Sequence, residues 1–247
     1  SFQVQWAYTI GNSNGKQAGY AIAPTGTSDE YLISGISKTN SFGNRDFYLV
    51  RIKDKGSDLT VQKAWQIGGP DSDDGNDLVR LNNGNYVLAG ESKSFVNNSD
   101  GVLLNFSLGN GNQLNINWTQ FTGSPATNDG IQAVAASANN ALTTVGYTDE
   151  QNNTGIYTSQ YNADGRFQWG NVIGGPNTDK PFGIARNKQG ETVIAGQSKA
   201  AGGTGSQDAY IAKLDATGTK KWDKVLGESN GVDRARDVIF NKAGNIV

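Results

Sequence analysis

The chain has 247 residues, of which 36% are hydrophobic and 33 are Gly, and its formal net charge is −2. Lys and Arg are scattered and form no basic stripe, which argues against nucleic-acid binding, and no apolar run approaches the roughly 18 residues of a membrane span. The chain contains no Cys and no His, which excludes disulfides, thiolate metal sites and the commonest general base.

An internal repeat of fifty-odd residues runs through the whole chain. An apolar run, usually opened by Trp, ends in Gly, and this Gly recurs 51 to 57 residues apart at Gly11, Gly68, Gly123, Gly174 and Gly227. A second Gly lies in an apolar-x-Gly-x-Ser/Thr step and recurs with the same drifting period at Gly35, Gly90, Gly146 and Gly196. Two markers with one period indicate a single structural unit repeated along the chain.

Each repeat divides into four short strands, and the fourth repeat illustrates the division. We predict strands over residues 182–187, 191–198, 208–215 and 219–227, because these segments are rich in β-branched and aromatic residues. Turn sequences such as Gln189-Gly190 and Ala216-Thr-Gly218 separate them. Four antiparallel strands in a repeat of this length predict an all-β fold, a β-propeller of four-stranded blades. The Trp of each fourth strand is then expected to fill space between blades.

The repeats predict one propeller domain over residues 1–247. We divide it into a closing strand (1–11), four repeats (12–68, 69–123, 124–174 and 175–227) and a partial repeat (228–247). Residues 232–240 are expected to form the first strand of a fifth blade, completed by the N-terminal strand, which would hide the exposed strand edges. The expected fold is therefore a five-bladed propeller whose last blade is incomplete or closed by residues 1–11. A piece of a larger ring is the alternative.

The repeat resembles the bacterial β-propeller repeat found in secreted and surface proteins. The segments that carry the resemblance are Gly84-Asn-Tyr-Val-Leu-Ala-Gly90, Asp46-Phe-Tyr-Leu-Val-Arg51, Asp208-Ala-Tyr-Ile-Ala-Lys213 and Ile173-Gly-Gly175. The third repeat departs from it, because Gly155 stands where Asp is expected. The resemblance implies an extracellular or cell-surface location.

We expect a non-catalytic module that binds a protein or a glycan, and no enzymatic activity. Missing His and loops rich in Asn, Gly, Ser and Thr support this expectation. One alternative is a structural subunit that contacts neighbouring subunits of a surface assembly. Another is a carbohydrate-active enzyme that uses two carboxylates on a propeller, which would require non-equivalent acids that converge on one pocket.

Residues that recur by symmetry are expected to serve the blade, whereas residues that break it are candidates for binding. The recurring acids include Asp46, Asp100 and Asp208, and we expect them to cap turns or bond backbone amides. An acidic loop containing Asp71, Asp73 and Asp77 is a candidate calcium site, since Ca²⁺ takes six to eight oxygen ligands; a solvated loop is the alternative, and no other cofactor is expected. Further candidates without clear equivalents are Phe95, Phe182, Arg166, Arg234 and Arg236.

Overall fold

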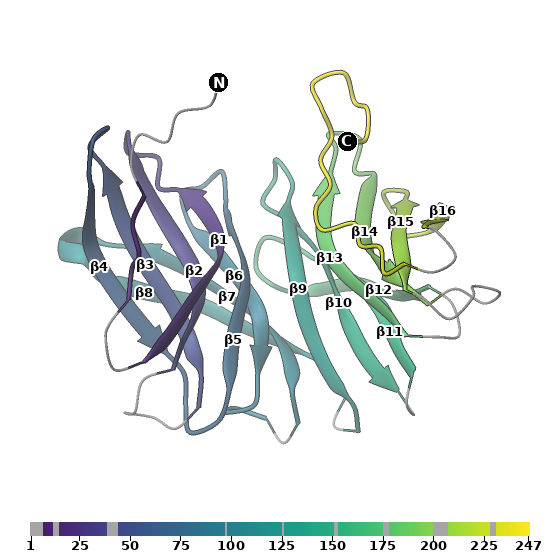
Figure 1. Cartoon of the computed structure of the whole chain (residues 1–247), viewed down its shortest axis with the longest axis horizontal. Coiled ribbons are helices and arrows are strands. Elements are labelled where there is room, and N and C mark those ends of the chain that lie inside the picture. The colour runs from purple at the N-terminus through teal and green to yellow at the C-terminus, as the bar shows by residue number, and fades with distance from the viewer. Residues whose placement is uncertain are drawn as a thin grey trace.

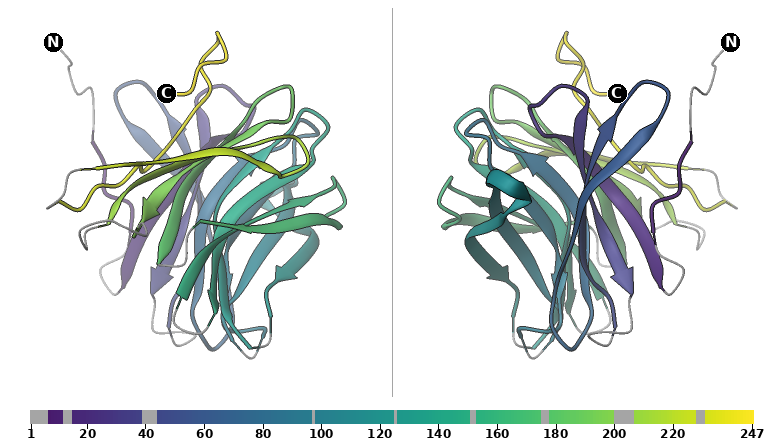
Figure 2. Two further views of the ribbon diagram at one scale, coloured as in Figure 1. Left: turned by 90° about the vertical axis from the view of Figure 1, so that its right-hand side faces the viewer. Right: turned by 90° about the vertical axis from the view of Figure 1, so that its left-hand side faces the viewer.

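The computed structural model describes residues 7–11, 15–38, 44–96, 98–124, 126–150, 153–174, 178–199, 207–227 and 231–247. Sixteen strands form four separate four-stranded antiparallel sheets, each made of four consecutive strands. The sheets follow one another in chain order around a common centre, as the blades of a propeller do (Figure 1). The side views in Figure 2 show the twist of each blade.

The blades are numbered in chain order and have nearly equal strand lengths. Blade one comprises β1 (Lys16–Pro24), β2 (Glu30–Lys38), β3 (Asp46–Asp54) and β4 (Leu59–Ile67). Blade two comprises β5 (Asp73–Arg80), β6 (Tyr86–Ser92), β7 (Asp100–Leu108) and β8 (Leu114–Thr122), with a short 3-10 helix, η1 (Asn110–Asn112), before β8. Blade three comprises β9 (Asn128–Ala136), β10 (Leu142–Glu150), β11 (Asn153–Tyr161) and β12 (Phe167–Ile173). Blade four comprises β13 (Asp179–Arg186), β14 (Thr192–Ser198), β15 (Asp208–Leu214) and β16 (Lys220–Leu226).

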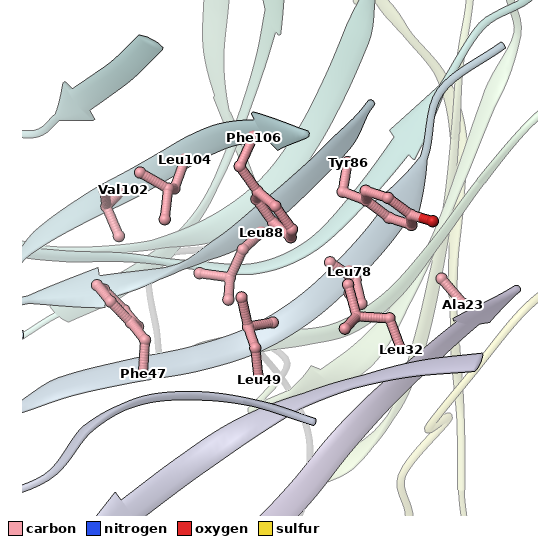
Figure 3. Close-up of a cluster of buried hydrophobic side chains, with 10 residues drawn as sticks. All are labelled: Ala23, Leu32, Phe47, Leu49, Leu78, Tyr86, Leu88, Val102, Leu104 and Phe106. Atoms are coloured by element: carbon pink, nitrogen blue, oxygen red, sulfur yellow. The ribbon is translucent and has the colours of Figure 1, made fainter. Parts of the chain in front are cut away.

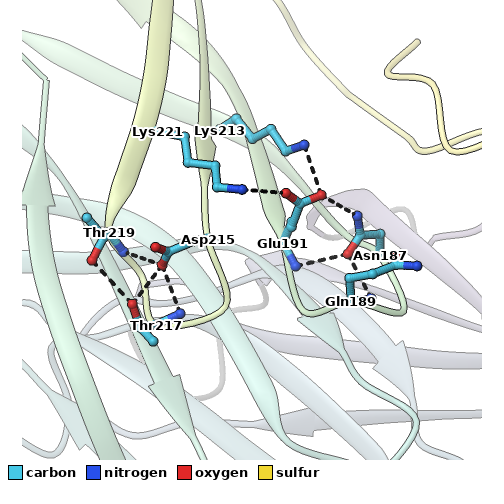
Figure 4. Close-up of polar contacts among 8 residues, drawn as sticks. All are labelled: Asn187, Gln189, Glu191, Lys213, Asp215, Thr217, Thr219 and Lys221. Atoms are coloured by element: carbon cyan, nitrogen blue, oxygen red, sulfur yellow. Dashed lines mark hydrogen bonds and ion pairs between the residues drawn. The ribbon is translucent and has the colours of Figure 1, made fainter.

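The predicted strands of the fourth repeat agree with blade four to within a few residues. Its turns close as the sequence predicts, through side chains that accept hydrogen bonds from nearby amides (Figure 4). Asn187 Oδ1 accepts from the amides of Gln189 at 3.0 Å and Glu191 at 2.9 Å. Asp215 Oδ1 accepts from the amides of Thr217 at 2.9 Å and Thr219 at 3.0 Å. Such Asx turns hold the hairpins at the register that buries the apolar faces.

Apolar clusters lie between successive blades. The cluster between blades one and two joins side chains of both sheets, among them Leu32, Leu49, Leu88 and Phe106 (Figure 3). Further clusters join blades two and three, blades three and four, and blade four and residues 231–247. Trp65 and Trp118 pack against the first two clusters, which confirms the expected role of these Trp side chains between blades.

The prediction of five blades is only partly right, because the structure has four complete blades. Residues 232–240 do not form the predicted strand; a single bridge joins Phe240 to Ile246. One bridged pair makes no ladder, and no second strand pairs with residues 232–239 within the described residues. Within the described residues the ring is not closed: residues 7–11 form no strand, and blades one and four share no sheet. The other residues of the predicted closing strand, 1–6, lie outside the described part.

Candidate functional site

The first strand of each blade lies at the centre and contains a bulge. Its register against the second strand shifts once in every blade, and one extra residue is inserted at each shift. A bulge aims a side chain away from the regular ladder. The four extra residues are Tyr20, Asn76, Gln132 and Phe182. All four line one central hollow of about 420 Å³, together with Arg236 and Asp237.

We call this hollow the central channel, and in it the repeat is no longer symmetric. The residue after the bulge is small in three blades, being Ala21, Ala133 or Gly183, whereas blade two has Asp77. Arg236 lies with its guanidinium carbon 4.5 Å from the centre of the Phe182 ring. The channel therefore combines carboxylates, a cation and aromatic rings from different blades.

Asp77 links blade two to blade three. Its Oδ2 accepts a hydrogen bond from the Val134 amide at 2.8 Å, and its Oδ1 accepts one from the Leu78 amide at 2.7 Å. Burial raises the pKa of Asp77, the two amides oppose that rise, and the charge of Asp237 adds to it. Both oxygens of Asp77 are thus engaged by the backbone, so this carboxylate stabilises the channel wall.

A second hollow, of about 460 Å³, adjoins the channel and shares Gln132 and Phe182 with it. We call it the mouth hollow. Its other lining residues are Glu91, Tyr147, Asp149, Lys180 and Pro181.

The two acids of the mouth hollow stand where the other blades have no acid. Glu91 directly follows the repeated Gly of the second strand, where the other blades have Ile36, Tyr147 and Gln197. Asp149 occupies the position that is Lys in every other blade, namely Lys38, Lys93 and Lys199. The two carboxyl groups come from neighbouring blades and are non-equivalent.

Glu91 has a specific partner across the blade junction. The Tyr147 hydroxyl donates a hydrogen bond to Glu91 Oε2, and burial, together with the nearby Glu91 charge, raises the pKa of the Tyr147 phenol. Gly130 makes room for this pair, since a Cβ on it would lie 2.6 Å from Glu91 Oε2 and 2.6 Å from a ring carbon of Tyr147. Lys180 takes the Gly130 position in blade four, so the strand that accommodates the pair in one blade supplies a cation in another.

The acidic loop of the sequence prediction does not assemble into one group. Asp73 is fully buried and accepts hydrogen bonds from Ser92 Oγ, Ser94 Oγ and the Gly69 amide. Asp77 faces the channel, and Asp71 lies at the exposed side of the loop. No three side chains of Asp, Glu, His or Cys gather to hold a metal ion within the described residues, so the structure gives Asp71, Asp73 and Asp77 no shared metal geometry.

Among the predicted recurring acids, Asp46 accepts a hydrogen bond from the Gln66 side chain at 3.3 Å, and Asp46 and Asp100 each keep one buried oxygen without a hydrogen bond within the described residues, so they do not cap turns as expected. The acids that open the first strands do bond backbone amides and hydroxyl groups at their blade junctions. Asp129 Oδ2, for example, accepts from the Ser124 amide at 2.9 Å and from Thr127 Oγ1 at 2.7 Å. The five residues predicted to break the symmetry of the repeat lie in different places. Phe182 and Arg236 line the channel, and Arg234 donates to Gln197 Oε1 at 2.6 Å. Phe95 packs near Phe121 and is 55% exposed, and Arg166 lies on an exposed turn.

Sequence reasoning missed Glu91, Gln132, Tyr147, Asp149 and Lys180. Their signal is present in the aligned repeats, as a change of residue type at fixed offsets from the repeated Gly. It is faint, because strand positions next to a Gly vary in most repeats and only the fold reveals which of them face the centre. No helix of the described residues is long and apolar enough to cross a membrane.

No protein-family model matches the chain, and no curated protein matches it in sequence. Solved structures do match. An α-L-arabinanase of Penicillium chrysogenum, complexed with arabinobiose, has a TM-score of 0.64 at 13% identity over 92% of this chain and 72% of its own. A GH93 α-L-arabinofuranosidase of Fusarium graminearum, also with arabinobiose, has a TM-score of 0.65 at 12% identity over 95% and 76%. An endo-arabinase of Bacteroides thetaiotaomicron has a TM-score of 0.55 at 11% identity over 95% and 88%.

These matches establish the propeller fold of the chain. They also contradict the expectation of a non-catalytic binding module without enzymatic activity, because these three similar structures are glycoside hydrolases. That expectation depended on the missing His and on the loops rich in Asn, Gly, Ser and Thr. It did not include the non-equivalent acids of the mouth hollow.

Proposed function

We propose that the chain is a carbohydrate-active enzyme that hydrolyses glycosidic bonds in the mouth hollow. The observation that carries the proposal is the pair Glu91 and Asp149, two non-equivalent acids from adjacent blades that line one polar hollow at the centre of a propeller. Glycoside hydrolysis requires such a pair, one group to protonate the leaving oxygen and the other to act as base or nucleophile.

The surroundings suggest a division of roles. The Tyr147 hydroxyl orients Glu91 by a hydrogen bond to its Oε2, so we give Glu91 the role of base or nucleophile and Asp149 that of proton donor. Phe182 and Tyr147 offer aromatic surface on which a sugar ring can pack, and Lys180 and Gln132 offer hydrogen-bond donors to its hydroxyl groups. Arabinose-containing oligosaccharides are the first substrates to test, since two of the similar enzymes were solved with arabinobiose.

The test is a hydrolysis assay of the purified chain on arabinan and arabino-oligosaccharides, with galactan and xylan in the panel. We expect release of reducing sugar, and a loss of at least about 100-fold in kcat for Glu91→Gln and for Asp149→Asn, as removal of an acid or base group costs. Asp164→Asn, on an exposed turn, is the matched control and should keep wild-type activity. Absence of hydrolysis on the whole panel, or full activity in both variants, would contradict the proposal.

We also propose that residues 231–247 belong to a fifth blade that completes the ring. They repeat the contacts with which other blades begin. The Asp233 amide donates to the Gln207 carbonyl as the Asp129 amide does to the Ser99 carbonyl, at 2.8 and 2.6 Å. Val238 is 4% exposed and packs in a cluster with blade four, so Val238→Asp should lower Tm by several degrees. An unchanged Tm would argue against a docked blade.

An extracellular or cell-surface location remains a proposal based on the repeat resemblance. Its support is the resemblance alone. Fractionation of the cells that produce the protein, followed by immunoblotting, checks it. Recovery of the protein only in the cytoplasmic fraction would contradict it.

A further inference from the structure

The interior of blade three differs chemically from that of the other blades. At one cross-strand pair, the other blades place Ile33 opposite Val50, Leu88 opposite Leu104, and Ile194 opposite Ala212. Blade three places Thr144 opposite Ser159 at the same distance from its repeated Gly. Both residues are at most 1% exposed, and their hydroxyl groups are 2.7 Å apart. Two small hydroxyl side chains therefore replace an aliphatic pair in a buried layer.

A cavity lies where this layer faces blade two. The pairs equivalent to it pack against the preceding blade, as Leu88 and Leu104 do in the cluster with blade one. In blade three the space is a cavity of about 200 Å³, walled by the end of β8 on one side and by β9 to β12 on the other. A water molecule needs about 10–15 Å³ of such volume, and pockets for drug-sized ligands are larger, about 300–1,000 Å³. The cavity thus suits a molecule of monosaccharide size.

The walls of this interblade cavity combine hydroxyl groups with a larger share of apolar surface, and they carry no cation. Hydroxyl-bearing residues Ser124, Thr144, Thr148 and Tyr157 line it, together with Asp129, which is 7% exposed. No Lys or Arg is among its lining residues, which disfavours phosphate and other anions. Ile131 and Val172 supply apolar surface. Hydroxyl donors and acceptors set among apolar surface match the alternating C–H and O–H surface of a sugar.

We propose that the interblade cavity binds a neutral monosaccharide or small polyol as a second site, separate from the mouth hollow. Tyr147 lines both spaces. Its ring is the shared wall, and its hydroxyl contacts Glu91 on the mouth side. A sugar in the cavity would therefore touch the side chain that holds Glu91. The binding itself does not depend on hydrolysis.

The test is ligand-observed saturation-transfer NMR, with L-arabinose, D-galactose and glycerol each titrated to about 50 mM. We expect saturable binding with a dissociation constant near 1 mM for at least one of them. Thr144→Val keeps the volume and removes one hydroxyl, so it should weaken binding about tenfold. Thr144→Leu restores the residue of blade two, fills the cavity and should abolish this binding. Ile194→Leu, at the same position in blade four, is the matched control and should bind as the wild type does.

Glu91→Gln separates the two sites. It removes the proposed hydrolytic group and should leave the Thr144-dependent binding in place, so loss of hydrolysis and loss of cavity binding are distinguishable. No saturable binding of any of the three compounds would overturn the proposal and leave a water-filled cavity. Binding that is equal in wild type, Thr144→Val and Thr144→Leu would overturn it as well, by placing the sugar elsewhere.

Discussion

Blades two and three share one backbone plan and differ in what they place inside it. Both pair four antiparallel strands around a Gly of the second strand, Gly90 in one and Gly146 in the other, with a bulge opposite. Blade two buries Leu88 and supplies Glu91, whereas blade three buries Thr144 and supplies Tyr147 and Asp149. The comparison teaches that the backbone fixes the repeat, and that the chemistry lies in side chains that the backbone leaves free to vary.

The largest expected effect on stability concerns the Gly of the second strand, which the two blades share. A Cβ at Gly90 would overlap the Asp74 carbonyl, and one at Gly146 would overlap the Gly130 carbonyl. These are backbone atoms of a paired strand, which cannot move aside without breaking the ladder. Gly90→Ala and Gly146→Ala should each lower the free energy of unfolding by about 3 kcal/mol or more, measured by urea denaturation.

Gly56→Ala is the matched control for this pair. Gly56 has a left-handed φ of 81°, unlike Gly90 and Gly146, and no atom lies within 4 Å of a Cβ there. Gly56→Ala should lower the free energy of unfolding by about 1–2 kcal/mol, the cost of placing Ala at a left-handed φ. Equal costs at Gly56, Gly90 and Gly146 would mean that close strand approach is not what the repeat conserves.

A second, smaller effect on stability distinguishes the interior of blade two from that of blade three. Leu88 is fully buried in the apolar cluster, so Leu88→Ala should cost about 2–5 kcal/mol. Thr144 faces the interblade cavity and exchanges one hydrogen bond with Ser159, so Thr144→Ala should cost about 1 kcal/mol. Urea denaturation of the two variants compares them directly. A cost at Thr144 as large as that at Leu88 would contradict a cavity on that face.

The smallest effect concerns the acid that blade two has and blade three lacks. Asp100 pairs with Ser92, as Gly155 pairs with Thr148. Burial raises the pKa of Asp100, and the charge of Asp129 raises it further. Asp100→Asn removes the buried charge, so Tm at pH 7 should rise by about 1–3 °C.

The pH dependence of this difference has a definite sign. A raised folded-state pKa means that the stability contributed by Asp100 is fully present below its unfolded value of 3.8 and is lost as pH rises through the folded value. The advantage of the Asn variant should therefore shrink as pH falls toward 3.8. Thermal melts at intervals from pH 7 to pH 3.5 measure it, and an advantage that grows on acidification would be the opposite result.

Much of the fold could be predicted from the sequence. The repeated Gly and the Gly-containing turns have local causes, close strand approach and left-handed φ, and they specify strand order and blade type. The recurring acids could be interpreted only in part: Asp73 and Asp129 bond to groups at their own blade junctions, whereas Asp46 and Asp100 each keep a buried oxygen without a hydrogen bond within the described residues.

The site could not be predicted to the same extent, for a geometric reason. Glu91 and Asp149 are 58 residues apart and meet only because two blades pack side by side. A strand position gives no sign of whether it faces the centre until the bulge of the first strand is known. The prediction of a calcium ligand at Asp77 failed for the opposite reason. Asp77 breaks the repeat, yet its carboxylate accepts a hydrogen bond from the Val134 amide and so joins two blades.

The most direct test of the account is a crystal structure of the Glu91→Gln variant soaked with an arabino-oligosaccharide. We predict that a glycosidic oxygen lies between residue 91 and Asp149, with a sugar ring against Phe182. Sugar bound away from the mouth hollow, or a hollow that stays empty while the wild type hydrolyses the same compound, would contradict the assignment of the reaction to these two acids.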